Sequence, residues 1–136
     1  MIIAVDVGLK RIGIAQYTAG IALPLEPILR KNRHQAAQEL DLLLEQKNAR
    51  MLIVGIPKEG GSSEEMERRI RHFVGLLRFC KEICFIDESY SSKEASERMR
   101  GVFKDRRDGR LDSLSALIIL ERFLSKKGDK EAQNRP

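Results

Sequence analysis

The pattern of apolar and polar positions over the first thirty residues predicts three strands. Residues 2–5 are apolar throughout, which is typical of a central strand buried on both faces, and Asp6 closes this run. Residues 10–17 alternate around an apolar face, and residues 21–29 follow after a tight turn, so these two segments predict an antiparallel hairpin. Two prolines lie in the last segment. Because proline cannot donate to a hydrogen-bond ladder, we expect residues 21–29 at an edge of the sheet.

The remainder of the chain alternates between helical and extended patterns. Apolar residues recur at helical spacing over residues 33–47, whereas short apolar runs at residues 51–55 and 83–86 predict two more strands. Residues 111–124 are apolar nearly all round, which predicts a buried helix. Two capping-box patterns predict further helices, one after Ser62 and one over residues 91–100.

This order of elements predicts an α/β domain. The two strands joined through helices should run parallel to the first strand and extend the sheet beyond it. We therefore expect a mixed five-stranded sheet, with three antiparallel and two parallel strands, flanked by helices. A chain of 136 residues is too short for two full domains, so we expect one domain over residues 1–125 and a charged, disordered tail over residues 126–136.

Composition narrows the class of protein. The first apolar run ends at Asp6, too early for a secretory signal or a membrane span, so we expect a cytoplasmic protein without membrane contact. Cys80 and Cys84 have no Cys or His cluster near them, which argues against a zinc site and predicts reduced thiols. With 25 basic and 20 acidic residues, the net charge of +5 slightly favours a polyanionic partner such as nucleic acid.

Most of the excess positive charge falls in residues 98–110, which hold six basic and two acidic residues. This segment is either a strip that faces phosphates or a solvated basic loop. The chain has five Phe, two Tyr and no Trp, without the interleaved aromatics of a base-stacking surface, so we expect recognition of nucleic acid by backbone and shape. The candidate phosphate-binding residues are Lys10, Arg11, Arg106, Arg107 and Arg110, although the first two could simply be outward-facing charges of the hairpin.

Three carboxylates fall where this architecture would gather them. Asp6 ends the first strand and Glu88 follows the fifth, and we expect neighbouring parallel strands to bring both to one edge of the sheet. Asp112 lies in the first turn of the apolar C-terminal helix, on the stripe of Ala116 and Ile119, so its side chain should point inward. Taken singly, each carboxylate has an ordinary explanation: support of a turn, solvation, or a charge at a helix N-terminus.

Together, these three carboxylates would repel one another strongly. At separations of about 4 Å and an effective dielectric near 20, each pair costs about 4 kcal/mol, so three pairs rival the stability of a whole domain. Divalent cations would remove this cost, and an all-carboxylate site favours Mg²⁺ or Mn²⁺. Two such ions roughly 4 Å apart could clamp a phosphodiester for hydrolysis. The pattern predicts a nuclease with Asp6, Glu88 and Asp112 as catalytic and metal-binding residues.

Four motifs in the same order resemble those of one family. Residues 6–15 read DVGLKRIGIA and resemble the DxGxKRIGxA opening motif of the RuvX family, also called YqgF. Residues 54–57 resemble its VGxP turn, Asp87-Glu88 its DE pair, and Asp112 with Ala116 its DxxAA motif in the last helix. The resemblance covers nearly all of residues 1–124.

The resemblance implies an RNase H-like fold and a cytoplasmic bacterial nuclease that matures the 5′ end of pre-16S rRNA during ribosome biogenesis. Members of the family were formerly labelled Holliday-junction resolvases, so branched DNA is the alternative substrate. The resemblance also implies that Asp6, Glu88 and Asp112 are the metal ligands. We expect a monomer or a homodimer.

The chain departs from the family pattern at several positions, including a shorter loop after Pro57 and Ser91-Ser92 in place of a Thr-rich pair. Ser89 stands where the family usually has Arg, which removes a potential bidentate phosphate contact, and Ser115 stands where the last-helix motif normally has Ala. A non-catalytic RNA-binding module that kept the fold is therefore a second hypothesis. A third is an ATPase of the actin and Hsp70 type, which also begins with a DxG strand, but those enzymes close two such domains around the nucleotide.

Overall fold

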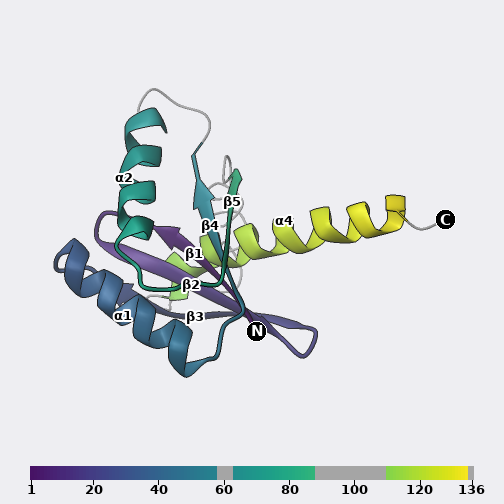
Figure 1. Cartoon of the computed structure of the whole chain (residues 1–136), viewed down its shortest axis with the longest axis horizontal. Helices are drawn as coiled ribbons and strands as arrows, with labels where there is room; N and C mark the ends of the chain where they lie inside the picture. The colour runs from purple at the N-terminus through teal and green to yellow at the C-terminus, as the bar shows by residue number, and fades with distance from the viewer. Residues whose placement is uncertain (58–62, 88–109, 135–136) are drawn as a thin grey trace.

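The computed structural model of the chain describes residues 1–57, 63–87 and 110–134 (Figure 1), and in the last range it describes the side chains of residues 113–125. The elements are β1 (Ile2–Val7), β2 (Arg11–Thr18), β3 (Ile21–Leu29), α1 (Arg33–Gln46), β4 (Met51–Ile56), α2 (Ser63–Gly75), β5 (Glu82–Asp87) and α4 (Arg110–Asn134). All five predicted strands are present, each with bounds within two residues of those expected. Ser62 and the helix predicted over residues 91–100 lie outside the described residues.

The strands form one mixed sheet in the order β3-β2-β1-β4-β5. β1 pairs antiparallel with β2 and parallel with β4, and β4 pairs parallel with β5. The predicted sheet of three antiparallel and two parallel strands is confirmed. β3, which contains Pro24 and Pro27, lies at an edge as expected, where the missing amide donors cost least.

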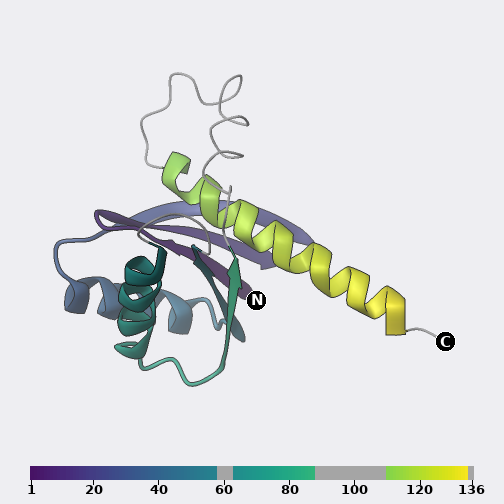
Figure 2. The ribbon, with the colours of Figure 1, turned by 90° about the horizontal axis from the view of Figure 1, so that it is seen from above.

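Helices cover the two faces of the sheet unequally. α1 and α2 lie on one face and α4 lies on the other (Figures 1 and 2). Alternation along β1 divides the apolar side chains between two cores: Ile3, Val5 and Val7 pack toward α1 and α2, whereas Ile2 and Ala4 pack toward α4. The sheet is thus buried on both sides, as the uninterrupted apolar run of β1 predicts.

α1 begins where the sequence predicts. Asn32 is its N-cap, and its side chain accepts a hydrogen bond from the amide of Gln35, whose own side chain returns to the Asn32 backbone. The buried face of α1 carries Ala36, Ala37 and Leu40, which is the apolar stripe that defined the helix.

α4 is buried along its first half and longer than predicted. Residues 113–120 are all buried, which confirms the helix that is apolar on every side. The helix continues to Asn134 instead of ending at residue 124, and its C-terminal part extends beyond the sheet (Figures 1 and 2). The division into a domain over residues 1–125 and a tail stays a prediction. None of the helices in the described parts of the chain combines the length and the apolarity needed to cross a membrane.

Candidate functional site

Asp6 lies inside β1. The β1–β2 ladder pairs Asp6 with Gly13 and continues for one further pair. The prediction that Asp6 closes the strand is therefore wrong, because pairing with β2 extends β1 past its apolar run to Val7. By alternation, Asp6 shares the face of Ala4, which is buried in the core beneath α4. Its partly buried carboxylate thus belongs to the α4 face of the sheet.

Two glycines flank Asp6 on the neighbouring strands. Gly13 is directly opposite on β2. On β4, the pairing of Val5 with Val54 places the next residue, Gly55, level with Asp6. Neither glycine carries a side chain that could press against the carboxylate. Glycine inside a strand often marks the close approach of a ligand or a second backbone, and here two such positions border one acid.

β4 separates Asp6 from the strand that leads to Glu88. As expected, the strands joined through helices extend the sheet beyond β1 and run parallel to it, with β4 beside β1 and β5 beyond it. Adjacent strands are about 4.8 Å apart, so β1 and β5 are separated by about 10 Å. Gly55 pairs with Ile86, which is buried toward α4, two residues before Glu88. Glu88 itself lies outside the described residues, so its approach to Asp6 stays a prediction.

A buried hydrogen bond fixes the start of α4 beside the row formed by Gly13, Asp6 and Gly55, which we call the Asp6 row. The register between β2 and β3 shifts between Ile12 and Ile14, and such irregularities leave a backbone group without a ladder partner. The amide of Ile14 donates to Ser113 Oγ at 3.0 Å, and the Ser113 side chain is fully buried. The first turn of α4 is thereby held against the β2 residue that follows Gly13. The backbone of Asp112 lies in this turn, whereas its side chain is outside the described set.

The turn after β1 is tightly specified. The amide of Gly8 donates to the carbonyl of Arg11 at 2.9 Å, and a Cβ on Gly8 would lie only 2.7 Å from that carbonyl oxygen, so the turn requires glycine. The amide of Arg30 donates to the carbonyl of Lys10 at 2.9 Å, and the Arg30 Nη1 donates to the carbonyl of Gly8 at 2.8 Å. Arg30 therefore stabilises the β1–β2 turn through hydrogen bonds to two of its carbonyl groups.

Of the predicted phosphate-binding residues, the structure places two near Asp6. Lys10 lies in the turn and Arg11 starts β2, and both are exposed. Arg11 shares the face of Gly13, on the diagonal from Asp6, where Cα atoms of antiparallel neighbours are about 7–8 Å apart. Arg106, Arg107 and the side chain of Arg110 lie outside the described residues, as does most of the basic segment.

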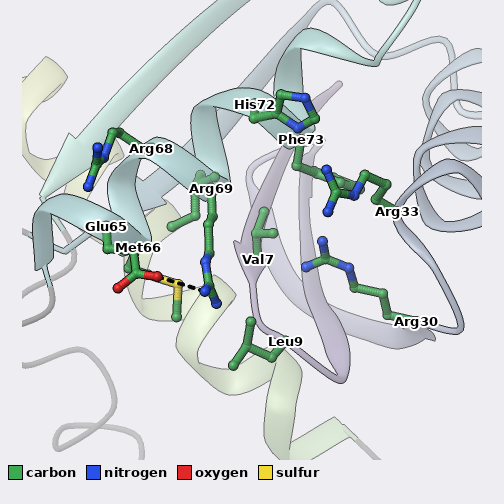
Figure 3. Close-up of a pocket in the computed structure, with 11 residues that line it drawn as sticks. Val7, Leu9, Arg30, Arg33, Glu65, Met66, Arg68, Arg69, His72 and Phe73 are labelled. Atoms are coloured by element: carbon green, nitrogen blue, oxygen red, sulfur yellow. Dashed lines mark hydrogen bonds and ion pairs between the residues drawn. The ribbon is translucent and has the colours of Figure 1, made fainter.

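An arginine-rich cavity on the opposite face was missed by the sequence analysis. It has a volume of about 670 Å³ and lies between α2, the β1–β2 turn and the β3–α1 connection (Figure 3). Its charged lining residues are Arg30, Arg33, Glu65, Arg68 and Arg69. Burial, and then repulsion from Arg33, lower the pKa of Arg30. The only sequence signals were two short basic clusters, about 35 residues apart, on segments that looked solvated.

The donors available for a metal ion are oxygens. Among the side chains that the structure describes, no three Asp, Glu, His or Cys side chains lie close enough to hold a metal. Two of the three predicted ligands, Glu88 and Asp112, fall outside that set. The donor chemistry nevertheless fits a hard cation, because the predicted ligands are carboxylates without His or Cys.

Two solved structures have a similar fold. A fowlpox virus Holliday junction resolvase matches 93% of this chain and 98% of its own, with a TM-score of 0.54 and 13% identity. RuvC of T. thermophilus, solved with a Holliday junction substrate, matches 90% of this chain and 96% of its own, with a TM-score of 0.52 and 14% identity. These likenesses show the fold, which is RNase H-like as the sequence analysis expected.

Relatives in sequence are much closer. A Campylobacter jejuni protein named "Putative pre-16S rRNA nuclease" is 57% identical over 125 residues, which cover 90% of this chain and 97% of the relative. A Sulfurovum protein of the same name is 53% identical over 123 residues, which cover 90% and 96%. The model of the family described as "RuvX: Holliday junction resolvase" matches residues 1–126. This chain therefore belongs to the RuvX family.

Proposed function

We propose that this protein is a cytoplasmic, metal-dependent endonuclease that hydrolyses phosphodiester bonds in structured RNA, and that its substrate is the 5′ end of pre-16S rRNA. The single observation that carries the proposal is the Asp6 row: a carboxylate flanked by Gly13 and Gly55 on the α4 face, near the carboxyl ends of β1 and β4. Close relatives that span nearly the same length are named for this substrate.

The proposal gives the three carboxylates the role of binding a cation, and Ser113 the role of positioning one of them. A divalent cation held by Asp6, Glu88 and Asp112 would activate the attacking water and neutralise charge on the phosphate. Gly13 and Gly55, both buried, place no side chain beside the carboxylate of Asp6. Ser113 anchors the turn that contains Asp112 through its bond with Ile14, and so positions that residue relative to β1.

Exposed cations beside the carboxylate would orient the substrate. Arg11, on the same face as Asp6, would contact the oxygens of the scissile phosphate, and Lys10 would contact the next phosphate along the strand. Arg106, Arg107 and Arg110 precede Asp112 in the chain and would guide the backbone toward it. The Gly8 turn and its contacts with Arg30 fix the place from which Lys10 and Arg11 act.

Branched DNA is the second candidate substrate. The description of the family model and the two solved structures with this fold all refer to Holliday junctions. A structured RNA precursor and a four-way DNA junction share a backbone bent around a charged surface, so their distinction requires a direct comparison of cleavage.

Cleavage assays test the proposal. Purified protein should cut a pre-16S rRNA fragment with Mg²⁺ or Mn²⁺ and not with chelator, and it should cut a four-way DNA junction more slowly. Asp112→Asn should abolish cleavage, whereas Asp41→Asn, an acid on α1 far along the chain from this site, should keep it. Equal cleavage in chelator, or by Asp112→Asn, would overturn the proposal. Tight, salt-dependent RNA binding with no cleavage under either metal would instead support the non-catalytic module.

A further inference from the structure

The arginine cavity on the α1/α2 face has no role in the chemistry assigned to Asp6. Its cations come from two regions: Arg30 and Arg33 from the β3–α1 connection, and Arg68 and Arg69 from α2. Figure 3 shows Arg30 and Arg33 reaching from one side, and Arg69 pointing from α2 toward Leu9. Among the described residues of the lining, Glu65 is the one acid, and it pairs with Arg69 at 2.7 Å. The lining therefore has an excess of three positive charges.

Neighbouring protein groups offset this charge only in part. The ion pair of Glu65 and Arg69 is more than half exposed on both sides, so solvent weakens it. Arg30 lies over the ring of Phe73, with its guanidinium carbon 5.2 Å from the ring centre, and donates to the Gly8 carbonyl. These contacts orient the guanidinium but carry no negative charge. Burial and the adjacent Arg33 lower the pKa of Arg30, which is the direction that a bound anion would reverse.

The cavity and the side chain of Asp6 lie on opposite faces of the sheet at the C-terminal end of β1. Asp6 faces α4, whereas the next residue, Val7, lines the cavity, as does Leu9 on the other side of Gly8. Consecutive Cα atoms are about 3.8 Å apart, so the same turn separates the two surfaces. Arg30 contacts this turn directly through Gly8 and Lys10. A polyanionic strand that passes over the turn would therefore meet both surfaces in succession.

We propose that the arginine cavity binds the phosphate backbone of the same nucleic-acid strand that is cut at Asp6, so that the strand is held on both faces of the sheet. This inference rests on the proposed nuclease function and adds a second contact site to it. Separated guanidinium groups suit successive phosphates, because each forms a forked contact with one phosphate. The aromatic ring in the lining, Phe73, is fully buried, so the site reads backbone and not bases.

A pair of substitutions with a matched control tests this inference. Arg33→Ala with Arg68→Ala removes two exposed cavity arginines. Arg50→Ala with Arg78→Ala removes the same charge from exposed positions that precede β4 and β5, at the opposite edge of the sheet. Binding of fluorescent single-stranded RNA is followed by anisotropy in chelator, so that the result does not depend on cleavage.

The salt dependence and the strand length give the decisive readouts. For a strand of about 16 nucleotides, the cavity variant should bind about tenfold more weakly, and its slope of log K against log salt should fall by about 1.4, or about 0.7 per lost phosphate contact. A strand of about 4 nucleotides has fewer phosphates with which to contact both surfaces, so we expect a smaller loss. The control variant should keep most of the slope for both strands.

Three results would overturn the inference. The first is an equal slope for the cavity and control variants. The second is an equal loss with the short and long strands, which would place these arginines at the cleavage site itself. The third is binding of inorganic tripolyphosphate that needs the cavity arginines while RNA binding does not, which would identify a site for small anions. Absence of metal-dependent cleavage would overturn the nuclease function alone, because the binding comparison is made without turnover.

Discussion

The two faces of the sheet have similar apolar cores and opposite polar chemistry. On the α4 face, the polar group at the end of β1 is the carboxylate of Asp6, bordered by glycines. On the α1/α2 face, the same strand end borders a cavity with four arginines. Alternation along β1 produces this division, since Asp6 and Val7 are consecutive residues with opposite directions.

On the proposed function, the two surfaces at the end of β1 would bind different ligands. Arg11 shares the face of Asp6, whereas the four cavity arginines lie on the opposite face. Because the sheet separates the cavity arginines from Asp6, a cation beside Asp6 and a phosphate in the cavity would not compete for the same side chains. A nucleic acid that carries phosphates past a metal site needs both.

The largest expected effect concerns chemistry on the α4 face. Asp6→Asn should lower the rate of RNA cleavage by at least about 10³-fold, because a neutral amide cannot hold the cation that stabilises the developing charge. In chelator, its melting temperature should be no lower than that of wild type, because one carboxylate less reduces repulsion in the cluster. A drop of several degrees would count against clustering, and unchanged cleavage would remove Asp6 from the site.

On the other face, the largest effect concerns stability. Phe73→Ala should lower the free energy of unfolding by about 3–5 kcal/mol, because the ring is fully buried between α2 and the sheet beneath Arg30. Chemical denaturation measures the change. Phe79→Ala, at a partly buried position against the same core, serves as the control and should cost clearly less. Equal losses would show that Phe73 is not central to this core.

An intermediate effect is expected where α4 meets β2. Ser113→Ala removes the acceptor of the Ile14 amide and leaves a buried N–H without a partner, so the free energy of unfolding should fall by about 1–3 kcal/mol. Cleavage should fall further than stability explains, because the turn that holds Asp112 loses its anchor. Ser115→Ala, two residues along the same buried helix, tests whether the effect belongs to this hydrogen bond. Identical losses in both variants would show that it does not.

The smallest effect is expected for Glu65, the acid in the lining of the arginine cavity. Glu65→Gln breaks an exposed ion pair with Arg69, which should change the free energy of unfolding by less than about 0.5 kcal/mol. RNA binding at low salt should become about twofold tighter, because the cavity loses an acid. Anisotropy titration of the variant beside wild type measures this change. Weaker binding would mean that Glu65 orients Arg69 for the ligand.

Several parts of the molecule were predictable because local physics decides them. The prolines of β3 exclude this strand from the interior of the sheet. The first half of α4 has apolar residues on all its sides and therefore has to be buried. The apolar stripe of α1 predicted a helix from Arg33, and the structure begins the helix there, after the N-cap Asn32. Asp6 was identifiable as a candidate because it follows an apolar run and opens a motif that resembles one of the RuvX family.

Other features were hidden because they depend on residues far apart in the chain. The bond between Ile14 and Ser113 spans 99 positions and arises from an irregularity in strand register that no periodicity shows. The order of β1, β4 and β5 follows from the predicted crossovers, but the distance between Asp6 and the segment leading to Glu88 depends on the strand that lies between them.

By itself, the sequence determined the strands, the helices, the candidate carboxylates and the family resemblance, because hydrophobic period, turn residues and motif spacing are local properties. Only the tertiary structure decided which residues share a face. Arg30 and Arg33 meet Arg68 and Arg69 because β3, α1 and α2 pack around one strand end, and Asp6 is separated from them because side chains alternate across a sheet.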